Sequence, residues 1–439
     1  MWTVPRLERL PSQAEFTGDY SWGYNSAFPF APETAYGSPD DMRRFVDEAH
    51  ARNMGVIIDV VDNHWGPEDL PMRCYDGDCL GAQGIYFYAD ARASTPWGPR
   101  PDFGRPEVRA YIEDSALAWL TELRCDGLRW DSVSNILQAS GVDNPDGRAL
   151  LVHAMDAIHA LPHKLMIAED LATIDLVTQP TSQNGLGFDT QWDAAFFHPV
   201  DDTCTAANDA ARSMAGLAAA IRHAYNGQHL QRVVYSEDHD EVANGRARIP
   251  EMISPGNAGS LLARKISTLG ALTVMASPGI PMLFMGQEFL QNGHFADDLP
   301  LDWSRAQTYA GILALYTDLV ALRKNTAGAT AGLSSEHTDV MHLNDVDKVI
   351  GWRRWGKGGP GDDVIVLANW SAKTFTAYDV GVPLPGTWHV RFNSDDRKYG
   401  ADYGGATSAD VVARGAQKDG YPNAITLPLA PYSAYVLSQ

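Results

Sequence analysis

Acidic residues at the ends of short apolar runs are the feature of this 439-residue chain that most restricts its fold. Asp131 and Glu169 each close such a run, and Asp240 lies just past a third one. Because helical stretches separate these runs, the pattern predicts the parallel strands of a βα-repeat protein. In a barrel of such repeats the C-terminal ends of the strands meet on one face, and we expect the three carboxylates to meet there.

Two or three carboxylates in one pocket can cleave a glycosidic bond, because one acts as nucleophile and another as proton donor. The composition agrees with such a site. A formal net charge of −21 argues against a nucleic-acid or anionic-membrane partner and suits a neutral substrate. The 12 Trp and 17 Tyr offer flat apolar faces on which sugar rings stack, although packing is the ordinary role of any one of them.

Four segments of the chain resemble, in the same order, the four signature regions of the α-amylase superfamily, glycoside hydrolase family 13. They are DVVDNH at 59–64, GLRWD at 127–131, AED at 168–170 and HD at 239–240. Four segments in order are far more specific than one, and the resemblance covers most of the chain. It implies an α/β fold, a TIM (β/α)8 barrel followed by a small antiparallel C-terminal β-sandwich, and a retaining mechanism.

The resemblance assigns the chemistry to three carboxylates. It implies that Asp131 is the nucleophile, that Glu169 is the general acid and then base, and that Asp240 grips the sugar at the cleavage site. Arg129 lies two residues before Asp131 on the same strand face, where its charge would keep Asp131 ionised. Taken alone, this pair is equally well explained as a structural ion pair. Asp170 competes with Glu169 for the acid role but points the opposite way on the strand.

Further residues are implied to bind the substrate or to support the site. Tyr24 resembles the residue that stacks against the reacting sugar, and His64 and His239 match residues that bind its hydroxyl groups. Arg129 belongs to the same substrate-binding set. Asp59 supports the site by pairing near Arg129.

The fourth signature region lies in an acidic stretch, Glu237 to Glu241. Mutual repulsion among these carboxylates predicts that at least one pKa is raised. A solvated acidic loop is the alternative interpretation.

We expect no cofactor. Calcium is the alternative, with Asn63 as the candidate ligand, because Asn63 matches a calcium ligand of many amylases. The family's calcium-binding His follows the nucleophile strand by four residues, and Asn135 stands there in this chain. Asp76 and Asp78 offer further oxygen ligands, but an Asp-Gly-Asp sequence is more often a turn.

Periodicity divides the chain into two domains. Residues 1–335 are the expected catalytic barrel, with an inserted subdomain in the irregular excursion at about 65–106. From about residue 349 the pattern changes to short strands separated by Gly, Pro and Asp turns, which predicts a β-sandwich domain at 345–439.

Local signals predict several elements of the barrel. A helix is expected at 39–52, with Ser38 as its N-cap and Phe45 on its apolar stripe. An Ala-rich helix is expected at 206–225, and the last barrel strand at 281–285.

The start of the barrel departs from the family pattern. The family's barrel has eight strands. Residues 6–10 match a later segment of that barrel, and the family's first strand comes before it. We find no sequence for that strand or its helix, so the N-terminus is expected to be truncated. A barrel without that strand leaves unpaired edges, unless another segment fills the gap or the barrel is open.

Several stretches, including 21–24 and 95–98, look more like glycogen-branching and trehalohydrolase-type members than secreted amylases. Branching enzymes, however, usually have a Ser before the His of the fourth region and a Gln after its Asp, unlike this chain. The expected function is therefore hydrolysis of α-1,4-glucosidic bonds in starch- or glycogen-type α-glucans, as in α-amylases. The alternatives are a 1,4-α-glucan branching enzyme, which is a transglycosylase, and an inactive or glucan-binding fragment.

The N-terminus has no apolar core of signal-peptide length, and no run reaches transmembrane length. We therefore expect a cytoplasmic protein whose partner is an α-glucan or malto-oligosaccharide, with no nucleic acid and no membrane. Cys125 and Cys204 are expected to be ordinary thiols. Cys74 and Cys79 are either free or, in an exported chain, joined in a small disulfide.

Overall fold

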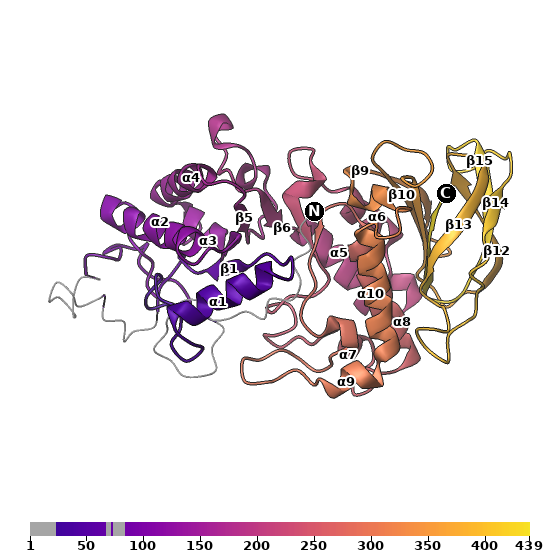
Figure 1. The fold of residues 1–439 in the computed structure, drawn as a ribbon, viewed down its shortest axis with the longest axis horizontal. Coiled ribbons are helices and arrows are strands. Elements are labelled where there is room, and N and C mark those ends of the chain that lie inside the picture. The colour runs from indigo at the N-terminus through magenta and orange to yellow at the C-terminus, as the bar shows by residue number, and fades with distance from the viewer. Residues whose placement is uncertain (1–22, 67–71, 73–83) are drawn as a thin grey trace. The chain divides into compact units, whose positions relative to one another are not determined.

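The structure, a computed structural model, describes residues 23–66, 72 and 84–439 of the chain (Figure 1). The chain divides into two units, residues 2–192 and residues 193–439, which we call the N-terminal and C-terminal units. The strand predicted at 6–10 and the turn predicted at 76–78 lie outside the described residues. No helix in the described part of the chain is long and apolar enough to cross a membrane.

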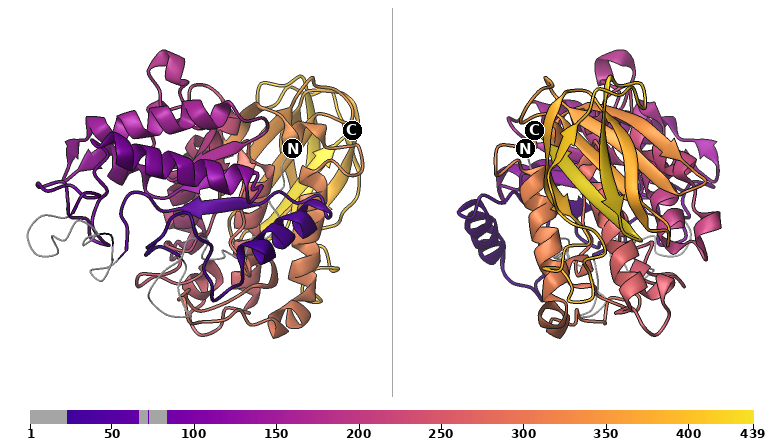
Figure 2. Two further views of the ribbon diagram at one scale, coloured as in Figure 1. Left: turned by 60° about the vertical axis from the view of Figure 1, so that its left-hand side comes forward. Right: turned by 90° about the vertical axis from the view of Figure 1, so that its right-hand side faces the viewer.

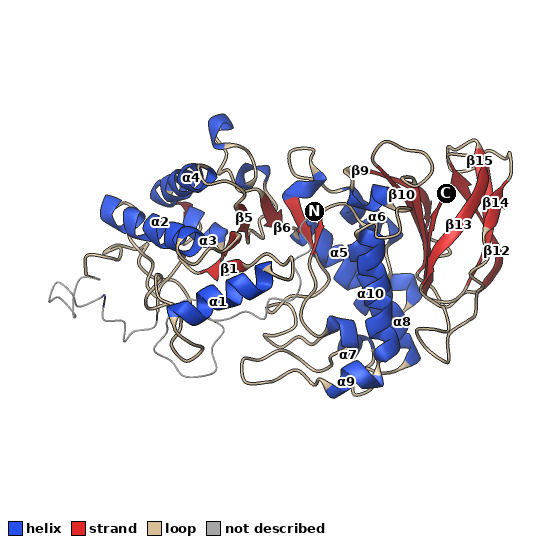
Figure 3. Ribbon diagram, viewed as in Figure 1, coloured by secondary structure: helices blue, strands red, loops and turns tan. Residues whose placement is uncertain are grey.

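The N-terminal unit contains a parallel sheet in which strands alternate with helices (Figure 3). Its strands lie side by side in the order β1, β2, β5, β6, and each pairs in parallel with the next. The elements are α1 (Pro39–His50), β1 (Ile57–Val60), α2 (Pro106–Thr121), β2 (Gly127–Trp130), α3 (Val133–Leu137), β3 (Gln138–Ala139), β4 (Val142–Asp143), α4 (Pro145–His159), β5 (Leu165–Ala168) and β6 (Thr190–Trp192). The predicted βα succession is therefore present here.

Helix α1 begins where its cap residue predicts. The Ser38 hydroxyl accepts a hydrogen bond from the Asp41 amide, and the Asp41 carboxylate accepts one from the Ser38 amide, which forms a capping box. The stripe Met42, Val46 and Ala49 is buried. Phe45 was wrongly placed on that stripe, since 39% of it is exposed.

The C-terminal unit begins with helices and two short parallel strands, β7 and β8. Its elements up to residue 323 are α5 (Ala194–Thr205), α6 (Met214–Arg222), β7 (Arg232–Val234), α7 (Ile249–Ile253), α8 (Leu261–Ala276), β8 (Ile280–Pro281), α9 (Ser304–Thr308) and α10 (Ala310–Arg323). The prediction of one helix at 206–225 was wrong, because Ser213 caps a shorter helix, α6, by accepting from the Gly216 amide. The strand predicted at 281–285 was also wrong in extent, since only β8 pairs with β7.

The rest of the C-terminal unit is antiparallel β-structure (Figure 2). One sheet has the order β14-β13-β16-β11-β10-β9, and β12 pairs with β15 in another. The strands are β9 (His337–Asn344), β10 (Val349–Trp355), β11 (Val364–Asn369), β12 (Phe375–Val382), β13 (Gly386–Asn393), β14 (Val411–Ala413), β15 (Asn423–Leu429) and β16 (Ser433–Ser438). Apolar side chains of both sheets share one buried cluster, which is the core of a sandwich.

Each unit has its own large hydrophobic core. The core of the C-terminal unit includes residues from α5, α6, α8 and α10 together with residues from β10, β11 and β16. Helices and β-sheet therefore share one core within this unit, while the domain boundary predicted at 335–345 stays a prediction. The thiols of Cys125 and Cys204 are free and buried, as expected.

Candidate active site

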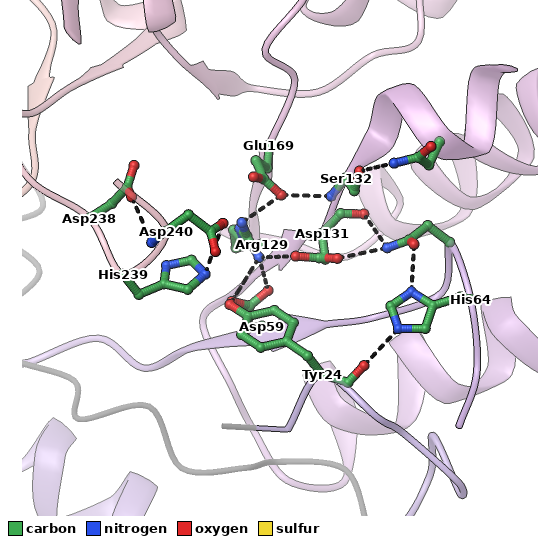
Figure 4. A network of polar contacts seen from close by, with 12 residues as sticks. Tyr24, Asp59, His64, Arg129, Asp131, Ser132, Glu169, Asp238, His239 and Asp240 are labelled. Atoms are coloured by element: carbon green, nitrogen blue, oxygen red, sulfur yellow. Dashed lines mark hydrogen bonds and ion pairs between the residues drawn. The ribbon is translucent and has the colours of Figure 1, made fainter. Parts of the chain in front are cut away.

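Strand β2 carries the first two candidate residues into the site. All of its residues are buried, and Gly127 lies so close to β5 that an added Cβ would be 2.2 Å from the Leu165 carbonyl oxygen. Glycine is therefore required where the strands approach. Arg129 and Asp131 lie two positions apart and face the same side, and Arg129 Nη1 is 2.7 Å from Asp131 Oδ1 (Figure 4). The predicted pair is present.

Arg129 connects three carboxylates in the N-terminal unit. Its Nη1 also donates to Asp59 Oδ1 at 2.7 Å, and its Nη2 is 2.7 Å from Glu169 Oε2. The guanidinium is buried and lies over the Trp192 ring, 4.5 Å from the ring centroid. Burial opposes its charge, but Asp59, Glu169 and Asp131 hold the pKa of Arg129 well above its usual value. The predicted nucleophile and acid are thus joined by one cation.

Glu169, at the end of β5, receives a second donor from the backbone that follows Asp131. The Ser132 amide donates to Glu169 Oε2 at 2.8 Å. Ser132 has φ 43°, a left-handed conformation that is uncommon for a residue with a side chain. Asn135 Nδ2 donates to the Ser132 hydroxyl at 2.6 Å. Sequence reasoning missed this support, since nothing in the sequence marks Ser132 as left-handed.

Asn63 contacts the other side of Asp131. Its Nδ2 donates to Asp131 Oδ2 at 2.7 Å, and its Oδ1 is 2.6 Å from His64 Nδ1. His64 Nε2 is in turn 2.8 Å from the Tyr24 carbonyl oxygen. Burial lowers the pKa of His64 to about 4, against the opposing charge of Asp131. A neutral ring carries one proton, so only one of these two contacts is a hydrogen bond at a time.

Tyr24 joins the network through Asp59. Its hydroxyl donates to Asp59 Oδ2 at 2.8 Å, and Arg129 Nη1 is 3.4 Å from the same hydroxyl. Asp59 therefore pairs with Arg129 as predicted and also fixes the Tyr24 phenol. Stacking of Tyr24 on a sugar stays a prediction.

In the C-terminal unit, the acidic stretch after β7 forms a turn. Asp238 Oδ1 accepts from the Asp240 amide at 2.9 Å and from the Glu241 amide at 2.8 Å. His239 Nε2 lies 3.3 Å from Asp240 Oδ2, and the Asp240 side chain is 56% exposed. Because Asp240 and His239 belong to this unit, their approach to Asp131 and Glu169 stays a prediction.

The expected pKa rise in this stretch is present, but repulsion is not its main cause. Burial raises the pKa of Glu237 to about 7 and that of Asp238 to about 6. The charges of Asp240 and Glu241 add to the second shift. Both side chains are buried, so the alternative of a solvated loop is wrong for Glu237 and Asp238.

The donor set around Asn63 does not fit a calcium ion. Both ends of its side-chain amide already contact protein groups, Asp131 and His64. Asn135 likewise directs its amide nitrogen at Ser132. Among the described residues, no group of three or more His, Cys, Asp or Glu side chains is placed to bind a metal. Asp76 and Asp78 lie outside that part of the chain.

Comparison with known proteins finds similarity over the C-terminal β-structure and over nearly the whole chain. Residues 340–439 match the family described as alpha amylase, C-terminal all-beta domain. A 1,4-alpha-glucan branching enzyme of Dechloromonas aromatica is 31% identical over 468 residues, covering 98% of this chain and 70% of the relative. One from Jannaschia sp. is 30% identical, covering 98% of this chain and 62% of the relative. The chain thus spans less than two thirds of that relative's length.

A solved structure with a similar fold is the α-amylase of Geobacillus thermoleovorans complexed with acarbose. The two share 18% sequence identity with a TM-score of 0.72, over 98% of this chain and 86% of that one. The predicted fold class is confirmed: parallel strands of a TIM-type (β/α) barrel precede an antiparallel all-β domain. The absence of a first barrel strand stays a prediction.

Proposed function

The chain belongs to the α-amylase superfamily, glycoside hydrolase family 13. On that premise we propose that it cleaves α-1,4-glucosidic bonds and transfers the glucan chain held on the enzyme to an acceptor. Asp131 is the proposed nucleophile and Glu169 the proposed acid and base. The observation that carries the proposal is the Arg129 guanidinium, which contacts Asp59, Asp131 and Glu169 together.

The proposed reaction has two displacements. Asp131 attacks the anomeric carbon, the bond to the leaving oxygen breaks, and Glu169 gives that oxygen a proton. An acceptor hydroxyl then attacks the same carbon, Glu169 takes its proton, and the ester bond to Asp131 breaks. Arg129 and Asn63 contact the two oxygens of Asp131 and orient its carboxylate for the first attack.

The donors around Glu169 determine where its proton is carried. Oε2 faces both the Ser132 amide and Arg129 Nη2. A carboxyl oxygen that carries a proton accepts hydrogen bonds less well than an ionised oxygen does. Oε2 already faces two donors, so the proton to be donated belongs on Oε1. Asp240, His239, His64 and Tyr24 are the proposed sugar-binding residues.

The acceptor decides between transfer and hydrolysis. The relatives that cover the chain are named 1,4-alpha-glucan branching enzymes, which favours transfer to a glucan hydroxyl over the hydrolysis expected from the sequence. We therefore place branching first. Hydrolysis of the α-amylase type is the second candidate, supported by the similarity to the Geobacillus fold. The proposed partner is an α-glucan or malto-oligosaccharide.

Product analysis on amylose tests the proposal. New α-1,6 linkages, measured by NMR of the anomeric protons, support branching, and new reducing ends without them support hydrolysis. The variant Asp131→Asn keeps the shape of the side chain and removes the nucleophile, so we expect nearly all turnover to be lost with the fold intact. If the full chain forms neither product, only the alternative of an inactive or glucan-binding fragment is left. Normal turnover of the variant would exclude Asp131 as nucleophile.

A further inference from the structure

The turn Thr95–Gly98, in the excursion of the N-terminal unit, is closed by one hydroxyl. Thr95 Oγ1 donates to the Gly98 carbonyl at 2.7 Å and accepts from the amides of Trp97 and Gly98 at 3.2 and 3.1 Å. The Thr95 amide also donates to the Gly98 carbonyl. These bonds fix the backbone on both sides of Trp97.

Gly98 brings this turn against the segment that follows β1. A Cβ at position 98 would lie 2.5 Å from the Gly66 carbonyl oxygen, 2.7 Å from the Trp65 carbonyl oxygen and 3.3 Å from His64 Cδ2. The Trp65 amide donates to the Pro99 carbonyl at 3.0 Å. Only glycine permits this approach, so the sequence at 98 sets the position of Trp97 beside His64.

Trp97 is exposed, whereas most tryptophans among the described residues are buried. It is 52% exposed, whereas Trp65, on the neighbouring segment, is fully buried. An exposed Trp by itself needs no explanation. This ring, however, lies 5.7 Å from the His64 ring, centroid to centroid, and His64 contacts Asn63, which contacts Asp131. An exposed aromatic face is therefore linked to the proposed nucleophile by contacts through two residues, His64 and Asn63.

We propose that Trp97 is a stacking platform for a glucosyl ring of the bound α-glucan, next to the sugar that reacts. This inference rests on the proposed function. The negative face of the indole attracts the C–H groups on the face of a pyranose ring, and the ring hydroxyls stay at the rim in water. The platform carries no charge, which suits a neutral substrate. Because the backbone of the turn is already fixed, little backbone entropy is lost on binding.

Binding of maltotetraose, measured by calorimetry, tests the platform. The parent is the full chain with Asp131→Asn, so that nothing is turned over. We expect Trp97→Ala to weaken binding about tenfold, which corresponds to about 1.4 kcal/mol, and Trp97→Tyr to stay within about threefold. The matched control is Trp303→Ala, since Trp303 is 51% exposed but packs against Phe289 in the C-terminal unit. It should leave the affinity unchanged.

The outcomes separate the platform from the proposed function. Equal affinity of the parent and the Trp97→Ala variant overturns the platform and leaves the proposed function standing. A parent that binds no maltotetraose, together with a full chain that forms no product from amylose, overturns both. If melting shows that Trp97→Ala does not fold, Trp97→Gln replaces it, because Gln keeps bulk beside His64 without an aromatic face. Affinity retained in that variant also overturns the platform.

Discussion

One cationic donor and one neutral donor, on opposite sides, determine the orientation of the Asp131 carboxylate. Arg129 Nη1 contacts Oδ1, and Asn63 Nδ2 donates to Oδ2. Both donors hold the carboxylate in one orientation, which the proposed attack on the anomeric carbon requires. Under the proposed mechanism Asn63 positions the Asp131 carboxylate, whereas its place in the signature region suggested a calcium ligand.

Substitution of Asn63 tests that role. Asn63→Ala removes one donor, and we expect kcat to fall roughly tenfold to a hundredfold. Asn63→Asp places a second carboxylate against Asp131. Repulsion then raises the pKa of the nucleophile, so the acidic limb of the pH–rate profile moves to higher pH. A pH–rate profile whose acidic limb stays at the same pH in both variants would contradict the assignment.

Asp62, the neighbour of Asn63, predicts a pH dependence of stability. It is buried, and burial raises its pKa to about 7, against the Trp65 indole that donates to it at 3.0 Å. A raised pKa means that the folded chain binds the proton more tightly than the unfolded chain. The contribution of protonated Asp62 to the free energy of unfolding is therefore complete at low pH, and it is lost as the pH rises from about 4 to about 7.

We expect Asp62→Asn to stabilise the chain by at least ~1 kcal/mol at pH 8, because the amide needs no ionisation. The gain should shrink as pH falls towards about 4 and disappear below about pH 3, where the carboxyl is protonated in both states. Thermal melts of the two proteins across this range measure the difference. A gain that does not change with pH would show that Asp62 is ionised without cost in the folded chain.

At the scale of elements, side-chain caps mark the start of some helices, α1 and α6 among them. Ser38 and Asp41 form a reciprocal pair at the start of α1. The same rule sets the start of α6 at Ser213, although the Ala-rich sequence before it seemed to extend the helix. In these two helices composition predicts helix content, and a side-chain acceptor for the free amides marks the first turn.

Removal of the α1 cap should therefore act locally. We expect Ser38→Ala to destabilise the helix by ~1 kcal/mol and to speed amide hydrogen exchange at Asp41 and Met42. Ser38→Asp keeps an acceptor and serves as the control, with exchange close to that of the unchanged chain. Unaltered exchange in the Ala variant would mean that packing alone sets the first turn.

At the scale of the molecule, two buried arginines, one on α10 and one on β10, hold the end of α8 within the C-terminal unit. Arg354, on β10, donates to the carbonyls of Ala276, Leu333 and Ser335, and Arg323 donates to those of Met275, Ser277 and Gly279. Burial lowers the pKa of Arg354 well below its usual value. The carbonyls that end α8 are thus satisfied by side chains far along the chain.

We expect Arg354→Met to lower the stability of the C-terminal unit by ~3 kcal/mol, since the Leu333 and Ser335 carbonyls lose this donor, while Trp352 Nε1 still donates to the Ala276 carbonyl. Arg391→Met, at an exposed position on β13, is the control and should change stability little. Thermal unfolding of the full chain measures both. Affinity for maltotetraose should be unchanged in either variant, because neither residue lies in the proposed site.

The sequence by itself determined the features that depend on neighbouring residues. The alternation of apolar strands and helices, the start of α1 and the acidic residues at the strand ends are local patterns, and the structure contains them. The pairing of Arg129 with Asp131 follows from their spacing of two on one strand, because alternate side chains share a face.

Only the tertiary structure decided the features that depend on distant contacts. Asn63 donates to Asp131, and the Ser132 amide to Glu169, because parallel strands bring their C-terminal ends together, and no local pattern states which atoms meet. The position of Trp97 depends on how closely Gly98 approaches residues 64–66. Periodicity reports which face of an element is buried, whereas packing between elements selects the partner of each polar atom.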